Sequence, residues 1–161
     1  MEENLTGGRS QEKEGGAECV TLRQEVCAAF PHRPVDIRTY SPLTLAFLGD
    51  GVYSVLARTI AVSMGNRQAH KLHEATGKLV SARAQARIGD AIRELLTKEE
   101  ERIYHRGLNA NPSHHAKNAS LEEYLKATAL ETLCGYLYLQ DNTERFLELL
   151  KEGMERAGIS L

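Results

Sequence analysis

The amino-acid sequence predicts an all-α protein, and three observations carry that prediction. Residues that favour helices (Ala, Leu, Glu, Lys and Arg) are plentiful, and Trp is absent. No segment shows the sustained alternation of apolar and polar residues that is typical of a β-strand. Ser and Thr stand at several positions where a helix would begin, followed by residues that complete a cap. The 161 residues are enough for one domain with a sizeable core.

The first 35 residues are expected to lie outside that domain. Residues 1–20 are rich in Gly, Glu and Ser and hold hardly any large apolar side chain, which predicts a disordered tail. An amphipathic turn or two follows at 20–30, and Pro31 and Pro34 end it. We therefore expect a tail and linker over residues 1–35 and a single domain over residues 36–161.

The helices of the domain are predicted from their caps. Ser41 precedes Pro42 at a helix start, and Gly65 ends the helix after about residue 64. Asn66 can cap a second helix that runs through Gly77. The later segments are a helix over 78–96, a helix over 97–106, a loop over 107–119, a helix over 120–139, and a helix from 142 or 143 to Gly158.

Two apolar stretches each carry one carboxylate. Asp50 lies in the middle of residues 43–64, and Glu131 lies in the middle of residues 127–139. A carboxylate among apolar neighbours is expensive to bury without a partner. One interpretation is that the fold brings both carboxylates around a metal ion. The other is that each caps a loop or pairs with an Arg in the core.

Charge and composition narrow the class of protein. The net charge is −2, but residues 58–117 hold eleven Lys and Arg against six Asp and Glu, a net of +5, which can form a basic patch. The three cysteines form no close pair and suggest a reducing compartment. Asp50 and Arg58 interrupt the best candidate for a membrane span, and the N-terminus lacks the apolar core of a signal peptide. We expect a cytoplasmic protein with no membrane partner.

Five stretches in order resemble a known family. They are FLGDGVY at 47–53, HKLHEATGKLVSARAQARI from 70, LTKEEERIYHRGLNA from 96, KNASLEEYLKATALE from 117, and ALETLCGYLYL at 129–139. Together they resemble the catalytic domain of ribonuclease III. The closer likeness is to the Mini-ribonuclease III family, the short bacterial form without a double-stranded-RNA-binding domain.

The resemblance implies an α-helical homodimer that hydrolyses phosphodiester bonds of double-stranded RNA with Mg²⁺. It also implies a role in maturation of the large-subunit ribosomal RNA precursor, with a ribosomal protein on that RNA as a further partner to be considered. Asp50 and Glu131 would be the catalytic residues and the metal ligands. Thr128 or Tyr53 could hold a metal-bound water, although Tyr53 is equally well explained as a core aromatic.

The chain departs from the larger enzymes at two acidic positions. Ala46 stands where they have a Glu, and Thr128 stands where they have an Asp, so that two carboxylates remain. One Mg²⁺ held by two carboxylates and several waters is ordinary chemistry. The short family also tends to have Arg and Lys where this chain has Leu108 and Asn111, which would weaken contacts of the loop with RNA.

Candidate RNA contacts are basic and amide side chains of the middle segment. Each can instead be an ordinary solvated charge or a turn residue. The candidates are Lys71, Lys78, Arg83, Arg87, Arg106, Asn109, Lys117 and Asn118, and the loop also holds His114 and His115.

A dimer interface is expected on one or both of the apolar helices. The helix over 121–139 is apolar on nearly every side, including Tyr136, and the stretch with Phe47 and Val55 shows the same excess. Two other functions stay open on the sequence alone. One is an RNA-binding or ribosome-assembly protein that keeps the fold but is catalytically weak, and the other is an all-α interaction module without a nucleic-acid role.

Overall fold

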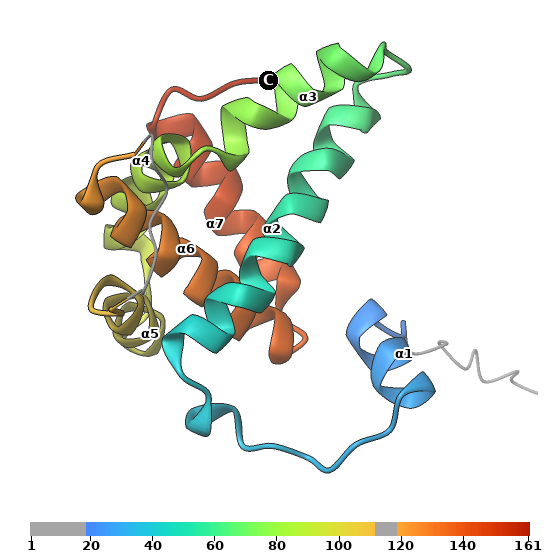
Figure 1. Ribbon diagram of the computed structural model, residues 1–161, viewed down its shortest axis with the longest axis vertical. Coiled ribbons are helices and arrows are strands. Elements are labelled where there is room, and N and C mark those ends of the chain that lie inside the picture. The colour runs from blue at the N-terminus through green and yellow to red at the C-terminus, as the bar shows by residue number, and fades with distance from the viewer. Residues whose placement is uncertain (1–18, 112–118) are drawn as a thin grey trace, which may run out of the picture. The chain divides into compact units, whose positions relative to one another are not determined.

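The structure is a computed structural model, which describes residues 19–111 and 119–161 (Figure 1). Every regular element in these ranges is a helix, so the predicted all-α class is confirmed. The elements are α1 (Leu22–Ala29), the short 3-10 helix η1 (Ile37–Thr39), α2 (Pro42–Ser63), α3 (Ala69–Val80), α4 (Ala82–Ile92), the 3-10 helix η2 (Arg93–Leu95), α5 (Lys98–Leu108), α6 (Leu121–Leu139) and α7 (Thr143–Arg156).

The chain divides into two compact units after Pro31. In the first unit, α1 begins at a capping box in which Thr21 and Gln24 bond each other's backbone N–H groups. The second unit, His32–Leu161, contains all the other helices. The expected boundary after residue 35 falls between α1 and η1.

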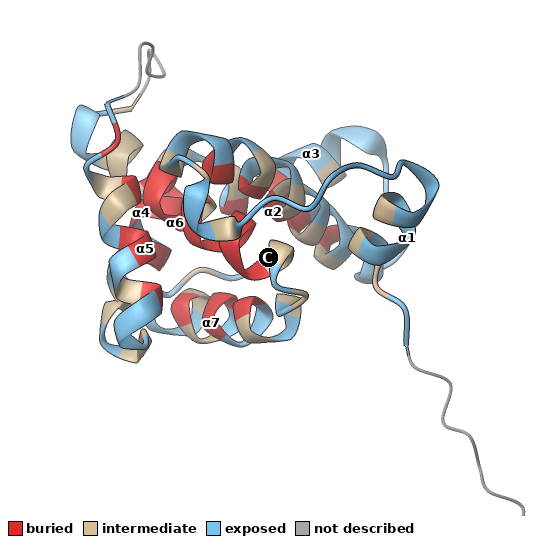
Figure 2. Ribbon diagram, turned by 90° about the horizontal axis from the view of Figure 1, so that it is seen from below, coloured by how far each residue is buried: buried red, intermediate tan, exposed pale blue. Residues whose placement is uncertain are grey.

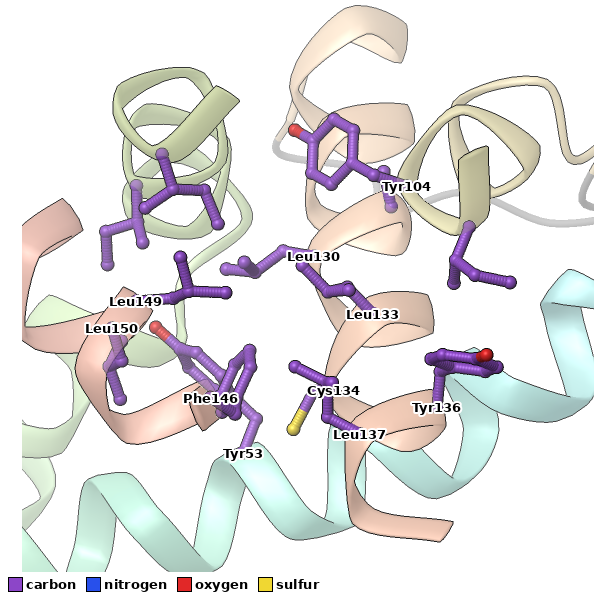
Figure 3. Close-up of a cluster of buried hydrophobic side chains, with 14 of the residues drawn as sticks. Tyr53, Tyr104, Leu130, Leu133, Cys134, Tyr136, Leu137, Phe146, Leu149 and Leu150 are labelled. Atoms are coloured by element: carbon purple, nitrogen blue, oxygen red, sulfur yellow. The ribbon is translucent and has the colours of Figure 1, made fainter. Parts of the chain in front are cut away.

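The second unit is built around α6. This helix contacts α2, α4, α5 and α7, and ten of its residues are buried (Figure 2). Aromatic and aliphatic side chains from several helices close on it, and Tyr53 of α2 meets Phe146 of α7 edge to face with ring centroids 6.2 Å apart (Figure 3). The apolar character of α6 on all sides is therefore satisfied within one chain.

Capping predicted most of the helix boundaries. Ser41, Thr97 and Ser120 each accept a hydrogen bond from a backbone N–H of the first turn that follows. The expected end of the second helix at Gly77 was wrong, because α3 continues to Val80. The break falls at Ser81, whose backbone is extended and whose Oγ accepts a bond from the Ala84 N–H at 3.2 Å.

Among the described residues, α2 alone has the length and apolar composition of a membrane-spanning helix. Its buried face packs against α6, as expected for a core helix, and Asp50 and Arg58 interrupt its apolar run. Length and composition are therefore weak evidence for a membrane span in this chain.

Candidate active site

The site is created by a close crossing of α2 and α6. A methyl group added at Gly49 would overlap the backbone carbonyl of Glu131 and lie 2.8 Å from the Gly135 nitrogen. A methyl group at Gly135 would overlap the carbonyl of Leu45 in the same way. The two backbones can approach this closely only because neither glycine has a side chain. Asp50 follows Gly49 in the sequence, and its negative charge acts on the carboxylate of Glu131, so the two groups lie near each other.

The two carboxylates lie in different environments. Asp50 is exposed, which corrects the expectation that it is buried among apolar side chains. Glu131 is partly buried, and its pKa is raised to about 7, first by loss of solvation and then by repulsion from Asp50. Mutual repulsion requires that the two groups be near each other. The structure thus brings together the two residues that the sequence singled out.

Gln85 of α4 is a third member of this site that sequence reasoning missed. Its side chain is only 2 % exposed. Its amide lies close enough to the carboxylate of Glu131 to favour the charged form, and this contact opposes the rise in the pKa of that group. The sequence could have indicated this position, because Gln85 is a polar residue on the same helix face as the apolar Ile88 and Ile92, and that face is buried. Gln85 limits how the Glu131 carboxylate can turn.

Two other polar groups near the carboxylates have structural roles. The Thr128 hydroxyl is buried and donates to the Tyr124 carbonyl of its own helix at 2.9 Å. The Tyr53 hydroxyl is buried and donates to the Leu79 carbonyl at 3.1 Å. Each hydroxyl has therefore used its only proton on a backbone carbonyl. The core explanation of Tyr53 is the one that its contacts favour.

The donor set fits a hard divalent cation that keeps much of its water. No group of three or more His, Cys, Asp or Glu that could hold a metal ion occurs in the part of the chain that the structure describes. The available donors are the oxygens of Asp50, Glu131 and the Gln85 amide. Carboxylate and amide oxygens suit Mg²⁺, which is often held by one or two carboxylates with waters in the other positions.

The predicted RNA contacts fall into four groups. Lys71, Lys78, Arg83 and Arg87 are exposed, with Lys71 paired to Glu74 at 3.1 Å and Arg83 loosely paired to Glu123 at 3.7 Å. Arg106 is half-buried and donates to the Tyr40 carbonyl at 2.8 Å, so it also ties α5 to the segment before α2. Asn109 is exposed at the C-terminal cap of α5. Lys117 and Asn118 lie outside the described residues, as do His114 and His115.

Two neighbouring carboxylates that suit a divalent cation, together with exposed cations on α3 and α4, are features expected of a metal-assisted nuclease. Comparison with known proteins identifies the class. The model of the ribonuclease III domain matches residues 43–142. The chain therefore belongs to the ribonuclease III family, and it is an endoribonuclease of the type that cleaves double-stranded RNA.

The relatives are of the short form. The Mini-ribonuclease 3 of Clostridium tetani is 39% identical over 117 residues, which are 72% of this chain and 78% of that protein. The Mini-ribonuclease 3 of Enterococcus faecalis is 39% identical over 125 residues, which are 76% of this chain and 95% of that protein. A crystal structure of a Fusobacterium nucleatum protein superposes with a TM-score of 0.69 at 30% identity and covers 76% of this chain and 99% of that one.

Proposed function

We propose that this chain cleaves double-stranded RNA with Mg²⁺, and that Asp50 and Glu131 are its catalytic residues and metal ligands. The observation that supports this proposal is the crossing of α2 and α6 at Gly49 and Gly135, which brings the two carboxylates together. Without a cation the two carboxylates repel each other, and this repulsion does not stabilise the fold.

Each residue of the site has a distinct part in this mechanism. Bound Mg²⁺ supplies positive charge for the scissile phosphodiester and for the activation of water. Asp50, which is exposed, presents its carboxylate at the mouth of the site. Glu131 provides the inner carboxylate, and Gln85 holds that carboxylate in one orientation. The buried Thr128 and Tyr53 hydroxyls donate to backbone carbonyls and thereby support the helices.

The RNA is bound mainly through its phosphates and its shape. Duplex RNA hides its base edges in a deep, narrow major groove, so a small helical domain reads phosphates and 2′-hydroxyls. The exposed cations of α3 and α4, Lys71, Lys78, Arg83 and Arg87, are the candidates for this contact. Binding that depends on such contacts weakens steeply as salt rises.

The active form is a homodimer, and the exposed face of α2 is its interface. In the single chain Phe47 is 84% exposed and Val55 and Val62 are 56% and 55% exposed, which is costly for such apolar side chains. A duplex has two strands of opposite polarity, and a two-fold axis relates two identical sites in the same way. The alternative interface on α6 is not supported, because Tyr136 and its neighbours are buried within the chain.

The RNA that this enzyme processes is the large-subunit ribosomal RNA precursor, in the cytoplasm. The support is the similarity to Mini-ribonuclease 3 proteins over about three quarters of this chain. A ribosomal protein bound to the precursor is a further partner to test. Adding such a protein to the cleavage assay would show whether it changes the rate or the position of the cut.

One observation favours a second function. With Ala46 buried and the Thr128 hydroxyl bonded to its own helix, only two carboxylates remain, which suits a catalytically weak RNA-binding or ribosome-assembly protein.

Incubation of the protein with duplex RNA, with and without Mg²⁺, separates the two functions. The nuclease cuts only with Mg²⁺, and Asp50→Asn binds the duplex without cutting it. Binding without cleavage by the wild type at any Mg²⁺ concentration would favour the second function.

A further inference from the structure

A cavity of about 360 Å³ lies between the start of α4 and the C-terminal segment of the chain. Its walls come from both sides of the α3–α4 corner and from the residues that follow α7. In Figure 1 the C-terminal segment, in red, passes α4 on its way toward α3. The residues that shape the cavity include Lys78, Ser81, Arg83, Arg87, Gly158 and Ser160.

The cavity wall is strongly basic. Lys78, Arg83 and Arg87 all line it, and no Asp or Glu of the described residues does. A neighbouring cavity of about 370 Å³ shares Arg83 and Arg87 but is also lined by carboxylates, among them Asp90, so its charges are compensated internally. Arg83 has a loose partner in Glu123 at 3.7 Å, which lines the neighbouring cavity, whereas no carboxylate of this wall balances Lys78 and Arg87. An anion between these cations is attracted to them. The contrast between the two cavities identifies the first as the one that suits an anion.

The start of α4 adds backbone donors to the same wall. The Ser81 hydroxyl satisfies the N–H of Ala84, while Ala82 and Arg83 hold first-turn positions whose N–H groups have no partner within a helix. A cation in the first turn is unfavourable in the field of the helix dipole, so Arg83 does not serve the stability of α4. Free N–H groups and a cation at one helix start are the usual surroundings of a bound phosphate.

The C-terminal segment holds the cavity in shape. Gly158 has a φ of +63°, which turns the chain out of α7, and the Ile159 N–H bonds the Met154 carbonyl at 2.9 Å. Arg87 donates to the Ala157 carbonyl, which fixes one side of its guanidinium and leaves other N–H groups to face a ligand. Ile159 packs against the hydrophobic core, so this wall is anchored.

We propose that this cavity is a phosphate-binding pocket and that the C-terminal segment is one of its walls. Its ligand is a backbone phosphate of the duplex RNA, bound away from the carboxylates Asp50 and Glu131, so the inference rests on the proposed function. The pocket contributes to affinity and to the register of the RNA, and it takes no part in bond cleavage. Free inorganic phosphate has the same chemistry and serves as the simplest probe.

The test uses Ser160→Glu, which places a carboxylate in the wall without removing any cation. Ser160 is exposed, so the change is tolerated by the fold, and thermal melting checks this. Ser63→Glu is the matched control, because Ser63 is exposed at the end of α2 and lines none of these cavities. In the wild type, inorganic phosphate at constant ionic strength should shift the backbone amide NMR signals of Ala82, Arg83 and Ser160. These shifts should be absent in Ser160→Glu and retained in Ser63→Glu.

The RNA arm measures binding of a short duplex RNA without Mg²⁺ and turnover with it. Ser160→Glu should raise the Kd about tenfold, and Arg87→Ala should reduce the salt slope by about 1. The control Ser63→Glu should keep the Kd and the kcat of the wild type. If inorganic phosphate shifts no amide signals in the wild type, the proposal that this cavity binds phosphate is wrong. If phosphate shifts the signals of the wild type but Ser160→Glu binds RNA with an unchanged Kd, the ligand of the cavity is not a phosphate of the RNA. A wild type that binds phosphate but never cleaves duplex RNA refutes the proposed function and leaves the pocket standing.

Discussion

The two long apolar helices, α2 and α6, look alike in sequence and differ in their surroundings. Each carries one carboxylate in an apolar run. In the structure α6 is covered on all sides by α2, α4, α5 and α7, whereas α2 is covered on one face only and exposes Phe47, Val55 and Val62 on another. The same difference separates the carboxylates, because Glu131 is partly buried and Asp50 is exposed. Apolar composition therefore identifies a helix that needs neighbours, but it does not tell where those neighbours come from.

The contact between these two helices is the feature whose loss should have the largest effect. Gly49→Ala places a methyl group against the Glu131 carbonyl, so the helices must separate. We expect a loss of more than about 3 kcal/mol in the free energy of unfolding, measured by urea denaturation. Gly77→Ala is the control, because open space surrounds Gly77 within α3, and the change should stabilise by about 0.5–1 kcal/mol. Equal effects of the two changes would contradict the close crossing.

The partly buried carboxylate should make stability depend on pH. Glu131 has a pKa of about 7 in the folded chain and 4.5 as its ordinary value. As pH rises from 4.5 to 7 the unfolded chain loses this proton first, so metal-free stability falls across that window and the loss is complete above it.

Replacing that carboxylate removes the pH effect. Glu131→Gln should stabilise the metal-free protein by up to about 3 kcal/mol at pH 8 and by little at pH 4.5. Urea denaturation at both pH values checks this. Asp50→Asn should have a smaller effect at pH 8, because Asp50 is exposed and acts only by repelling Glu131. A gain from Glu131→Gln that is the same at both pH values would contradict the raised pKa.

The exposed face of α2 should control association. Phe47→Glu should weaken the dimer by about 2 kcal/mol or more, roughly a thirtyfold rise in its Kd, because it places two like charges at the two-fold. Sedimentation at several micromolar concentrations measures this, while folding is unaffected because Phe47 is 84% exposed. Leu147→Glu on α7 is the control, since Leu147 is 42% exposed and outside the proposed interface. A wild-type monomer that cuts both strands efficiently would refute the dimer.

The smallest effect is expected at Thr128. Its hydroxyl bonds the Tyr124 carbonyl of the same helix, so Thr128→Val should change the free energy of unfolding by no more than about 1 kcal/mol. The rate of RNA cleavage should be that of the wild type. A large loss of cleavage with normal stability would show that this hydroxyl acts in the site after all.

The sequence predicted the fold class and most helix starts. The helix starts follow from local patterns, because caps such as Ser41 and Thr97 act on the next turn of the chain. The approach of Asp50 to Glu131 is not a local pattern: the residues left two interpretations open, and the family resemblance favoured the one in which the two carboxylates meet. The end of α3 was missed because Gly77 is a conspicuous helix breaker, whereas Ser81 stops the helix by capping the next one. Gln85 was missed for another reason. Its role depends on Glu131, which lies 46 positions later and meets it only through packing of α4 on α6.

The central claim is that Asp50 and Glu131 form one Mg²⁺ site at the crossing of α2 and α6. A double-mutant cycle tests it directly, with Asp50→Asn, Glu131→Gln and the double variant. The readouts are calorimetric Mg²⁺ binding and single-turnover cleavage of duplex RNA. We predict that each single change abolishes measurable Mg²⁺ binding and slows cleavage by at least about a thousandfold, and that the double variant is no slower than the worse single one. Mg²⁺ binding that survives either change, or losses that multiply in the double variant, would contradict the shared site.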